Sequence, residues 1–341
     1  MRKEKKILDG IISSERNARV FPSHQLVWEW EQNLAKILKV RIIDYSFLRR
    51  MEYKVFRWLH LVPLFQKMLP SSNLSLKYVV NAELKPFCEI NRNTIPAIVD
   101  FWLEEDDLPE FWSLYKNCPL VLVSNREVYD FLSKHPHPVP VEHWPLSYPD
   151  RYELKENDFE KEYEFCIIGR ANPFFLRMLD RYSKSHPDFR YILNNDDISH
   201  RKYVTNDGIC ISDDNSRESY FNMIKKTKIS CYTTPGLDEA KKETSRYNQV
   251  TPRVMELLCN GCQVIGHYPM TADVCWYKLY DVVPNVDTYE EFEVQLDRMR
   301  EESFDFEKVK AFMSNHYTST RAKMLKDILE RHDIIIKVGQ K

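Results

Sequence analysis

The chain of 341 residues is long enough for two domains of ordinary size, and its 43% hydrophobic content is sufficient for full cores. Its 49 Lys and Arg residues nearly balance 51 Asp and Glu residues, and the net charge of −2 argues against a dedicated nucleic-acid-binding protein. Only 7 glycines occur, and their spacing forms no Gly-rich phosphate-binding loop. These counts exclude a P-loop NTPase and disfavour a standard dinucleotide-binding site.

No uninterrupted apolar stretch reaches the roughly 18 residues of a membrane-spanning helix, and the charged N-terminus lacks the apolar core of a secretion signal. We therefore expect a cytoplasmic protein whose 8 cysteines are reduced. Cys259 and Cys262 form one C-x-x-C pair, but no second pair completes a zinc site. A metal or redox role for this pair is the less favoured alternative.

The first half of the chain alternates short apolar runs with amphipathic stretches. The runs predict strands at 41–45, 77–82, 95–102 and 119–125. The amphipathic stretches predict helices around 46–69, 107–117 and 125–134. A Pro-rich stretch at 135–150 and a charged stretch at 153–162 follow, and together they are typical of an interdomain connector.

The second half repeats this alternation more regularly. Strands are expected at 163–169, 189–193, 208–212, 228–234, 262–268 and 280–284. Helices are expected at 174–184, 218–226, 253–260, 289–299 and 318–336. Strands that alternate with helices of this length predict parallel sheets with helices on both faces.

The predicted fold is therefore α/β with two domains. An N-terminal domain at 1–145 and a C-terminal domain at 161–317 are joined by a linker at 146–160. A last helical segment at 318–341 can cross back to the N-terminal domain. Two such sheets can face each other across a cleft, and ligands bind at the carboxyl ends of parallel strands.

The most informative segment begins at Thr251, a good helix N-cap, followed by Pro252, a favoured first helical residue. Gly261 suits the end of this helix. Arg253 then lies in the first turn, where the helix dipole favours an anion, and Glu256 lies one turn later on the same face. Such a helix can hold a phosphate with the arginine and ribose hydroxyls with the glutamate. The alternative is a surface or interdomain ion pair.

Residues 256–265 resemble the donor-site helix of GT-B glycosyltransferases of the family 4 type, E-(A/L)-(L/M)-(A/S)-C-G-x-(P)-V-(I), whose glutamate holds the nucleotide ribose. Residues 167–170 are similar to the strand end of this family whose arginine, here Arg170, contacts the donor diphosphate. Residues 121–125, with the later 141–150, resemble the exit from its acceptor domain. The resemblance implies two Rossmann-like domains and the transfer of a hexose to a surface glycan of the bacterial type.

The resemblance and the helix analysis together give six donor-binding candidates: Arg170, Asn172, Thr234, Asn248, Arg253 and Glu256. Asn248 stands where the family usually has a second glutamate near the transferred sugar, eight positions before Glu256. The family's diphosphate-binding lysine is also absent, and Arg177 is the nearest basic residue after Arg170. Thr234 follows a predicted strand, where an ordinary strand-to-helix turn is an equally good interpretation.

When a glycosyl–phosphate bond breaks, negative charge collects on the departing diphosphate and must be stabilised. Metal-dependent enzymes of this kind commonly hold a cation with D-x-D, and no two Asp residues here are two positions apart. We therefore expect no metal and no cofactor. Arg170, Arg253, and either Lys228 or Arg177 would bind the diphosphate of a nucleotide-sugar substrate such as a UDP- or GDP-sugar.

Two residues of the N-terminal domain are candidates for taking the acceptor proton. His24 precedes an aromatic helix start, and a histidine titrates near neutral pH. Asp100 ends a predicted strand, a common position for a catalytic group. The alternatives are a packed histidine for His24 and a helix cap for Asp100, and Glu83 is a weaker candidate.

Residues 46–69 interleave five basic residues with an apolar, Trp-bearing face and contain a single acid, Glu52. A helix of this kind can lie on an anionic membrane, and the alternative is a core helix with a solvated basic face. The expected partners are thus a nucleotide sugar and a glycan or lipid-linked acceptor, with peripheral membrane contact through 46–69 and no nucleic acid.

The sequence therefore predicts a metal-independent glycosyltransferase that acts in surface polysaccharide synthesis. Two alternatives remain open. A nucleotide-sugar epimerase of the same fold would need no acceptor. A catalytically inactive nucleotide-sugar-binding or scaffold protein is the second alternative, and Asn248 is its best support in the sequence.

Overall fold

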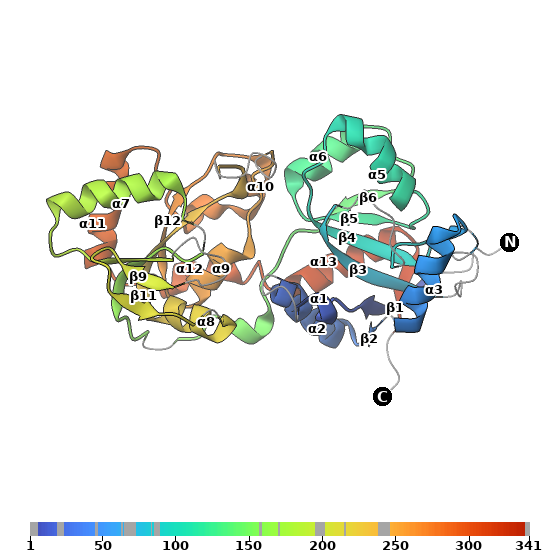
Figure 1. The fold of residues 1–341 in the computed structure, drawn as a ribbon, viewed down its shortest axis with the longest axis horizontal. Helices are drawn as coiled ribbons and strands as arrows, with labels where there is room; N and C mark the ends of the chain where they lie inside the picture. Colours follow the sequence, from blue (N-terminus) through green and yellow to red (C-terminus); the bar gives the residue numbers. More distant parts are fainter. Residues whose placement is uncertain are drawn as a thin grey trace. The chain divides into compact units, whose positions relative to one another are not determined.

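The structure, a computed structural model, describes residues 6–18, 24–44, 47–62, 64, 73–82, 84, 89–156, 159–169, 171–194, 202–214, 216–237 and 246–337. The chain divides into two compact units (Figure 1). Unit 1 comprises Met1–Arg151 and His316–Lys341, and unit 2 comprises Tyr152–Asn315. Each unit is an α/β domain built around one largely parallel sheet. None of the described helices is long and apolar enough to cross a membrane.

Unit 1 has a sheet of seven described strands in the order β13-β1-β3-β4-β5-β6, with β2 also pairing with β1, and all of its strand pairs are parallel. The strands are β1 (Lys6–Ile12), β2 (Arg41–Ile43), β3 (Asn73–Asn81), β4 (Thr94–Asp100), β5 (Val121–Val123), β6 (Val141–His143) and β13 (Ile334–Ile336). Nearly every residue of β4 is buried, as expected of a parallel strand covered on both faces.

The helices of unit 1 are α1 (Glu15–Ala18), α2 (Gln25–Leu38), α3 (Phe47–Trp58), α5 (Leu108–Tyr115), α6 (Arg126–Lys134) and α13 (Thr318–Arg331), with the 3₁₀ helices η2 (Glu105–Asp107) and η3 (Asp150–Tyr152). The first core of unit 1 lies under α2 and α13, where Trp30 and Leu34 of α2 and Leu325 of α13 cover alternate residues of β3 and β4. The last segment of the chain thus completes the first domain.

Two sequence predictions for unit 1 are wrong in detail. The segment 318–336 is not one helix, because α13 ends at Arg331, Asp333 adopts a left-handed backbone with φ 56°, and three isoleucines then form β13 against β1. β-branched residues favour a strand at this point. The connector predicted at 135–150 contains β6, which pairs with β5 and follows Pro140 at the sheet edge, where proline is tolerated.

Unit 2 has a sheet of six described strands in the order β10-β9-β8-β7-β11-β12. The strands are β7 (Tyr163–Cys166), β8 (Tyr191–Asn194), β9 (Tyr203–Thr205), β10 (Cys210–Ser212), β11 (Thr227–Thr233) and β12 (Gln263–His267). The pairs from β8 to β12 through β7 and β11 are parallel, whereas β9 is antiparallel to both β8 and β10. The predicted strand 208–212 therefore belongs to an antiparallel edge.

The helices of unit 2 are α7 (Pro173–Ser185), α8 (Arg217–Lys226), α9 (Pro252–Cys259), α10 (Ala272–Tyr277), α11 (Tyr289–Glu301) and α12 (Phe306–Met313), with the 3₁₀ helices η4 (Pro235–Leu237) and η6 (Leu279–Asp281). The aromatic core under α7 and α11 includes Phe175, Tyr182 and Phe292. The segment 280–284, predicted as a strand, is not one. It begins within η6, and the chain then makes only a bridge from Asn285 to Gly266 of β12.

Candidate functional site

The N-termini of three helices lie at the carboxyl edge of the unit 2 sheet. Asn172 caps α7 by accepting a hydrogen bond from the Phe174 N–H at 2.8 Å, and Ser216 caps α8 by accepting one from the Ser219 N–H at 3.0 Å. Thr251 occupies the N-cap position of α9, but its side chain bonds no backbone N–H of that helix. Because α7, α8 and α9 all follow strands that end at this edge, their positive dipole ends favour an anion there.

Arg253, in the first turn of α9, lies against the backbone of Gly169, just beyond β7. Gly169 has φ +86°, and a Cβ placed there would lie 2.5 Å from Arg253 Cζ. Two features therefore require glycine at this position. Its backbone is left-handed, and the close approach of the guanidinium leaves no room for a Cβ. In the described part of the chain, the ion pair of Glu256 is formed with Arg217 rather than with Arg253. Both residues of this pair belong to unit 2, and their side chains are only 17% and 6% exposed.

Glu256, one turn further along α9, has an almost completely buried carboxylate, with only 4% of the residue exposed. The Tyr220 hydroxyl donates to its Oε2 at 2.5 Å, and Arg217 Nη2 lies 3.4 Å from its Oε1. Burial, followed by the charge of Glu256, raises the pKa of Tyr220 well above its ordinary value, so the phenol stays a donor. The sequence analysis missed both partners, although Arg217 and Tyr220 share the one-turn spacing of Arg253 and Glu256.

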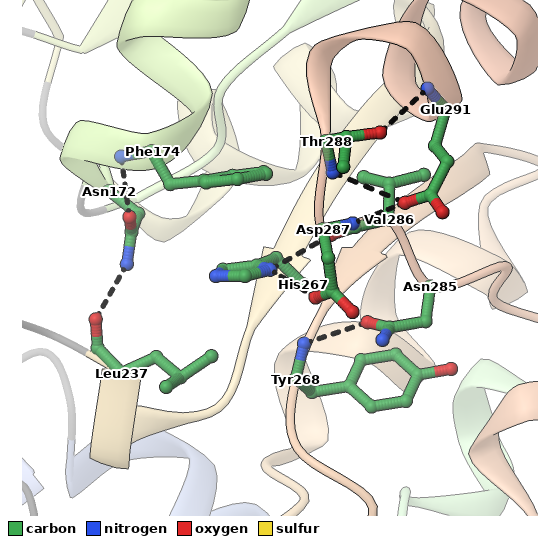
Figure 2. A network of polar contacts seen from close by, with 10 residues as sticks. All are labelled: Asn172, Phe174, Leu237, His267, Tyr268, Asn285, Val286, Asp287, Thr288 and Glu291. Carbon is green, nitrogen blue, oxygen red and sulfur yellow. Dashed lines mark hydrogen bonds and ion pairs between the residues drawn. The ribbon is translucent and has the colours of Figure 1, made fainter.

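Side-chain hydrogen bonds connect the loop after β11 to the segment before α9 and to the start of α7. The buried Thr234 hydroxyl donates to Asn248 Oδ1 at 2.7 Å, and the Asn248 side chain packs so closely on Gly236 that a Cβ there would overlap with it. On the other side, Asn172 Nδ2 donates to the Leu237 carbonyl oxygen at 3.0 Å (Figure 2). Asn172, Thr234 and Asn248 therefore lie close together around this loop.

Five of the six predicted donor-binding residues thus lie at this edge of unit 2, namely Asn172, Thr234, Asn248, Arg253 and Glu256. Arg170 lies outside the described residues, next to Gly169. Lys228 is misplaced for binding a diphosphate here, since it is at the amino end of β11 and donates to the Arg300 carbonyl oxygen. Arg177 is exposed on α7, about one turn after its first residue.

The two predicted catalytic residues belong to unit 1. His24 is the N-cap residue of α2 without a side-chain capping bond, and burial and the charge of Lys77 lower its pKa. Asp100 ends β4, and burial raises its pKa to about 7. It is not a helix cap, because Glu104 and Asp107 form the capping box of the helix that follows. Glu83 lies outside the described residues.

Glu31 of α2 is a further carboxylate of unit 1 that the sequence analysis missed. It is fully buried and accepts the Ser14 N–H at 2.8 Å, just after β1. Burial raises its pKa to about 7, while the charge of Lys77 and the bonds from Ser14 act in the opposite direction. The sequence does not single out Glu31, because its position falls on the periodic apolar face of α2, where a core residue is expected.

Within the described ranges, no group of three or more His, Cys, Asp or Glu side chains is placed so that it could hold a metal ion. Cys262 is fully buried and its thiol donates to the Ile224 carbonyl oxygen at 3.2 Å. Burial raises its pKa to about 11, so this thiol is protonated at neutral pH.

Scans of the chain against protein-family models and against curated proteins give no match. Similar solved structures include a trehalose-6-phosphate synthase studied for glycosyltransfer with retention (TM-score 0.50, 10% identity, 80% of this chain and 78% of that one). A second is trehalose-6-phosphate from E. coli bound with UDP-2-fluoro glucose (TM-score 0.50, 10% identity, 85% of this chain and 86% of that one).

The pneumococcal O-GlcNAc transferase GtfA, with UDP and GlcNAc, also resembles this chain, which spans only 60% of the length of that protein (TM-score 0.47, 10% identity, 80% of this chain). At these identities the likeness establishes the fold. The chain has the GT-B fold of two parallel-sheet α/β domains, as the sequence predicts.

Proposed function

We propose that the chain is a metal-independent glycosyltransferase that moves a hexose or related sugar from a nucleoside diphosphate to a glycan or lipid-linked acceptor, in surface polysaccharide synthesis. The observation that carries the proposal is the start of α9. There Arg253 lies on Gly169, and one turn later Glu256 is held in a buried position by Arg217 and Tyr220.

The diphosphate of the donor is assigned to Arg253, to Arg170 and to the N-termini of α7 and α9. A guanidinium is permanently charged and matches phosphate oxygens in pairs, so it stabilises charge on a leaving nucleotide without a cation. The close contact with Gly169 fixes the guanidinium before the donor arrives. Such preorganised donors contribute most where charge develops in the transition state.

The ribose of the donor is assigned to Glu256. A carboxylate offers about four acceptor positions, and Tyr220 and Arg217 each use one of them. Carboxylate oxygens accept hydrogen bonds, and the two ribose hydroxyls of a nucleotide can donate them. The partners on α8 prevent the carboxylate from rotating, so α8 serves to orient a group that α9 supplies.

The acceptor is assigned to unit 1, with Asp100 as the base. A carboxyl whose pKa is about 7 is partly ionised at neutral pH and can take the proton of an acceptor hydroxyl. His24 is a second candidate, since the lowered pKa keeps its ring neutral and able to accept.

Contact with an anionic membrane is assigned to the α3 surface, which we define as Met51, Val55, Trp58, Leu59, Leu61 and Leu64. All six side chains are exposed, and Trp58 is 79% exposed. Met51, Val55 and Trp58 follow the spacing of one helix face, and the exposed basic residues Lys54 and Arg57 lie beside them. An apolar face next to basic side chains favours an anionic lipid surface, where a lipid-linked acceptor would lie.

The proposal is tested first by isothermal titration with UDP, GDP and CMP. Binding of one nucleotide by the wild-type chain, weakened at least tenfold in Arg253→Ala and Glu256→Ala, is the expected result. Arg298→Ala is the matched control, because Arg298 of α11 forms an exposed ion pair with Glu302, the residue that follows this helix. No heat with any nucleotide would favour an inactive scaffold. Turnover of a nucleotide sugar without release of free nucleotide would favour an epimerase.

A further inference from the structure

His267 lies at the carboxyl end of β12, the last strand in the order of the unit 2 sheet, and nothing in its sequence context singles it out. It is the last residue of β12 and is in register with Thr233 of β11, directly before Thr234. Its side chain is 21% exposed. The residue therefore shares the carboxyl edge of the sheet with Asn172 and Asn248.

The tautomer of His267 follows from its hydrogen bonds. Nδ1 lies 2.9 Å from the Val286 carbonyl oxygen and 3.3 Å from Asp287 Oδ1 (Figure 2). A carbonyl oxygen only accepts, so Nδ1 carries the proton, and in the neutral ring Nε2 is an acceptor. Figure 2 shows this second nitrogen on the side of the ring away from Val286 and Asp287, toward Asn172 and Leu237.

The ring is also fixed in orientation. It stacks face to face on Phe174, with centroids 3.8 Å apart and planes inclined by 7°. Phe174 belongs to the first turn of α7, which Asn172 caps. Glu291 of α11 accepts the Asp287 N–H at 2.8 Å and so holds the segment that bears the bonding groups. An acceptor clamped in this way loses little entropy when it receives a ligand group.

We propose that His267 Nε2 accepts a hydrogen bond from a hydroxyl of the transferred sugar, and that Asp287 is a positioning residue that helps to keep the proton on Nδ1. The inference rests on the proposed function. An acceptor nitrogen cannot bond an ionised phosphate oxygen, which also only accepts, whereas every sugar hydroxyl can donate. Arg253 and Glu256 are assigned to the diphosphate and ribose of the nucleotide. The acceptor nitrogen at the end of β12 is therefore assigned to the sugar, the remaining part of the donor.

The test compares the affinities of His267→Ala for UDP-glucose and for UDP, or for GDP-mannose and GDP if the titration above selects guanosine. The sugar nucleotide is expected to bind about tenfold more weakly than to the wild-type chain, while the affinity for the free nucleotide changes less than twofold. Retained nucleotide binding also shows that the variant folds. His267→Gln, which keeps an acceptor on a side chain of similar reach, should recover part of the loss. Asp287→Asn should cause a smaller loss of the same kind.

His186 provides the matched control. It stacks on Tyr182 at 4.0 Å and bonds the Tyr182 carbonyl oxygen, but it follows the opposite end of α7. His186→Ala should leave both affinities unchanged. Equal losses for the sugar nucleotide and the nucleotide in His267→Ala, or no loss for either, would overturn the inference. A wild-type chain that binds no nucleotide sugar would instead overturn the proposed function.

Deoxyfluoro analogues of the donor sugar identify the hydroxyl, because fluorine cannot donate a hydrogen bond. For one ring position, the analogue should bind the wild-type chain and His267→Ala equally, as a double-mutant cycle requires of two partners in one interaction. Weaker binding to His267→Ala that persists with every analogue would contradict a hydroxyl contact.

Discussion

The guanidinium of Arg253 rests on the Cα of Gly169, so that the first turn of α9 and the end of β7 share one contact. A Cβ at position 169 would lie 2.5 to 2.7 Å from three guanidinium atoms. Two segments 84 residues apart in the sequence thereby form one surface beside the N-terminus of α7. In the described part of the chain, the arginine is thus positioned by the backbone at the end of β7, while Glu256 of its own helix pairs with Arg217.

Gly169→Ala is predicted to weaken nucleotide binding at least tenfold. The added methyl group displaces the guanidinium, and the left-handed backbone adds a cost of about 1 kcal/mol in stability. Gly208→Ala isolates the second effect, because Gly208 has φ +88° and a Cβ added there would meet nothing within 4 Å. Titration and thermal unfolding of both variants provide the measurement. Equal nucleotide affinities in the two variants would contradict a role for the contact.

Tyr220→Phe is predicted to weaken nucleotide binding severalfold while the fold is retained. The variant removes the hydroxyl that donates to Glu256 and leaves a buried carboxylate with one partner fewer, at a cost of about 1 to 3 kcal/mol in unfolding free energy. Tyr289→Phe removes a similar bond, from Tyr289 to Glu293 at 2.8 Å on α11, and should not change nucleotide affinity. Titration calorimetry distinguishes the two. Unaltered affinity in Tyr220→Phe would show that Glu256 needs no orienting partner.

The alternation of strands and helices could be predicted from the sequence because it depends on local patterns. The helix expected at 253–260 is α9, Pro252–Cys259, and the strand expected at 228–234 is β11, Thr227–Thr233. Strands β1 and β9 were missed, since Gly10 and two charged residues interrupt the first, and the second has only three residues. The helix predicted at 318–336 includes the residues of β13. The chain leaves the helix at Asp333, which has a left-handed backbone, and no glycine marks this turn in the sequence.

The partners of the site residues could not be predicted in the same way. Spacing along α9 places Arg253 and Glu256 on one face, but the pairing of Glu256 with Tyr220 depends on how α8 and α9 pack on the sheet. His267 reads as the end of a strand, and its bond to Val286 requires the chain to return beside β12 after η6. Contacts between elements of this kind depend on packing rather than on local sequence pattern.

Asp100 is predicted to give the enzyme a pH profile that rises toward neutrality. Burial raises the pKa of this carboxyl to about 7, so the ionised base becomes up to tenfold scarcer with each pH unit below that value. A plot of kcat/KM against pH should therefore rise and level off above pH 7, and Asp100→Asn should abolish the rising limb and lower the plateau. Asp106→Asn, at an exposed position on η2, is the control. A rising limb that survives in Asp100→Asn would exclude Asp100 as the base.

Glu31 is predicted to make the protein less stable as the pH rises from about 5 to 7. Its pKa is about 7 in the folded state and lies near 4.5 in the unfolded chain, so between these values the folded state holds a proton that the unfolded state has lost. More protons bound to the folded state mean that stability falls with rising pH. Glu31→Gln should flatten this slope in urea unfolding measured at a series of pH values. A slope equal to that of the wild-type chain would show that another group titrates instead.

The α3 surface is predicted to bind vesicles that contain anionic lipid. Trp58→Ser together with Val55→Ser removes two exposed apolar side chains from one helix face and should reduce the bound fraction at least tenfold, since each buried apolar side chain contributes about 1.5 to 3 kcal/mol. Val294→Ser, at a 63% exposed valine of α11 in unit 2, is the matched control. Sedimentation with vesicles of phosphatidylcholine and phosphatidylglycerol at low and high salt measures the apolar and the electrostatic contributions to binding. High salt screens the attraction of basic residues such as Lys54 and Arg57 to anionic lipid. Binding that is equal for neutral and anionic vesicles, or unchanged by the double substitution, would assign the membrane contact elsewhere.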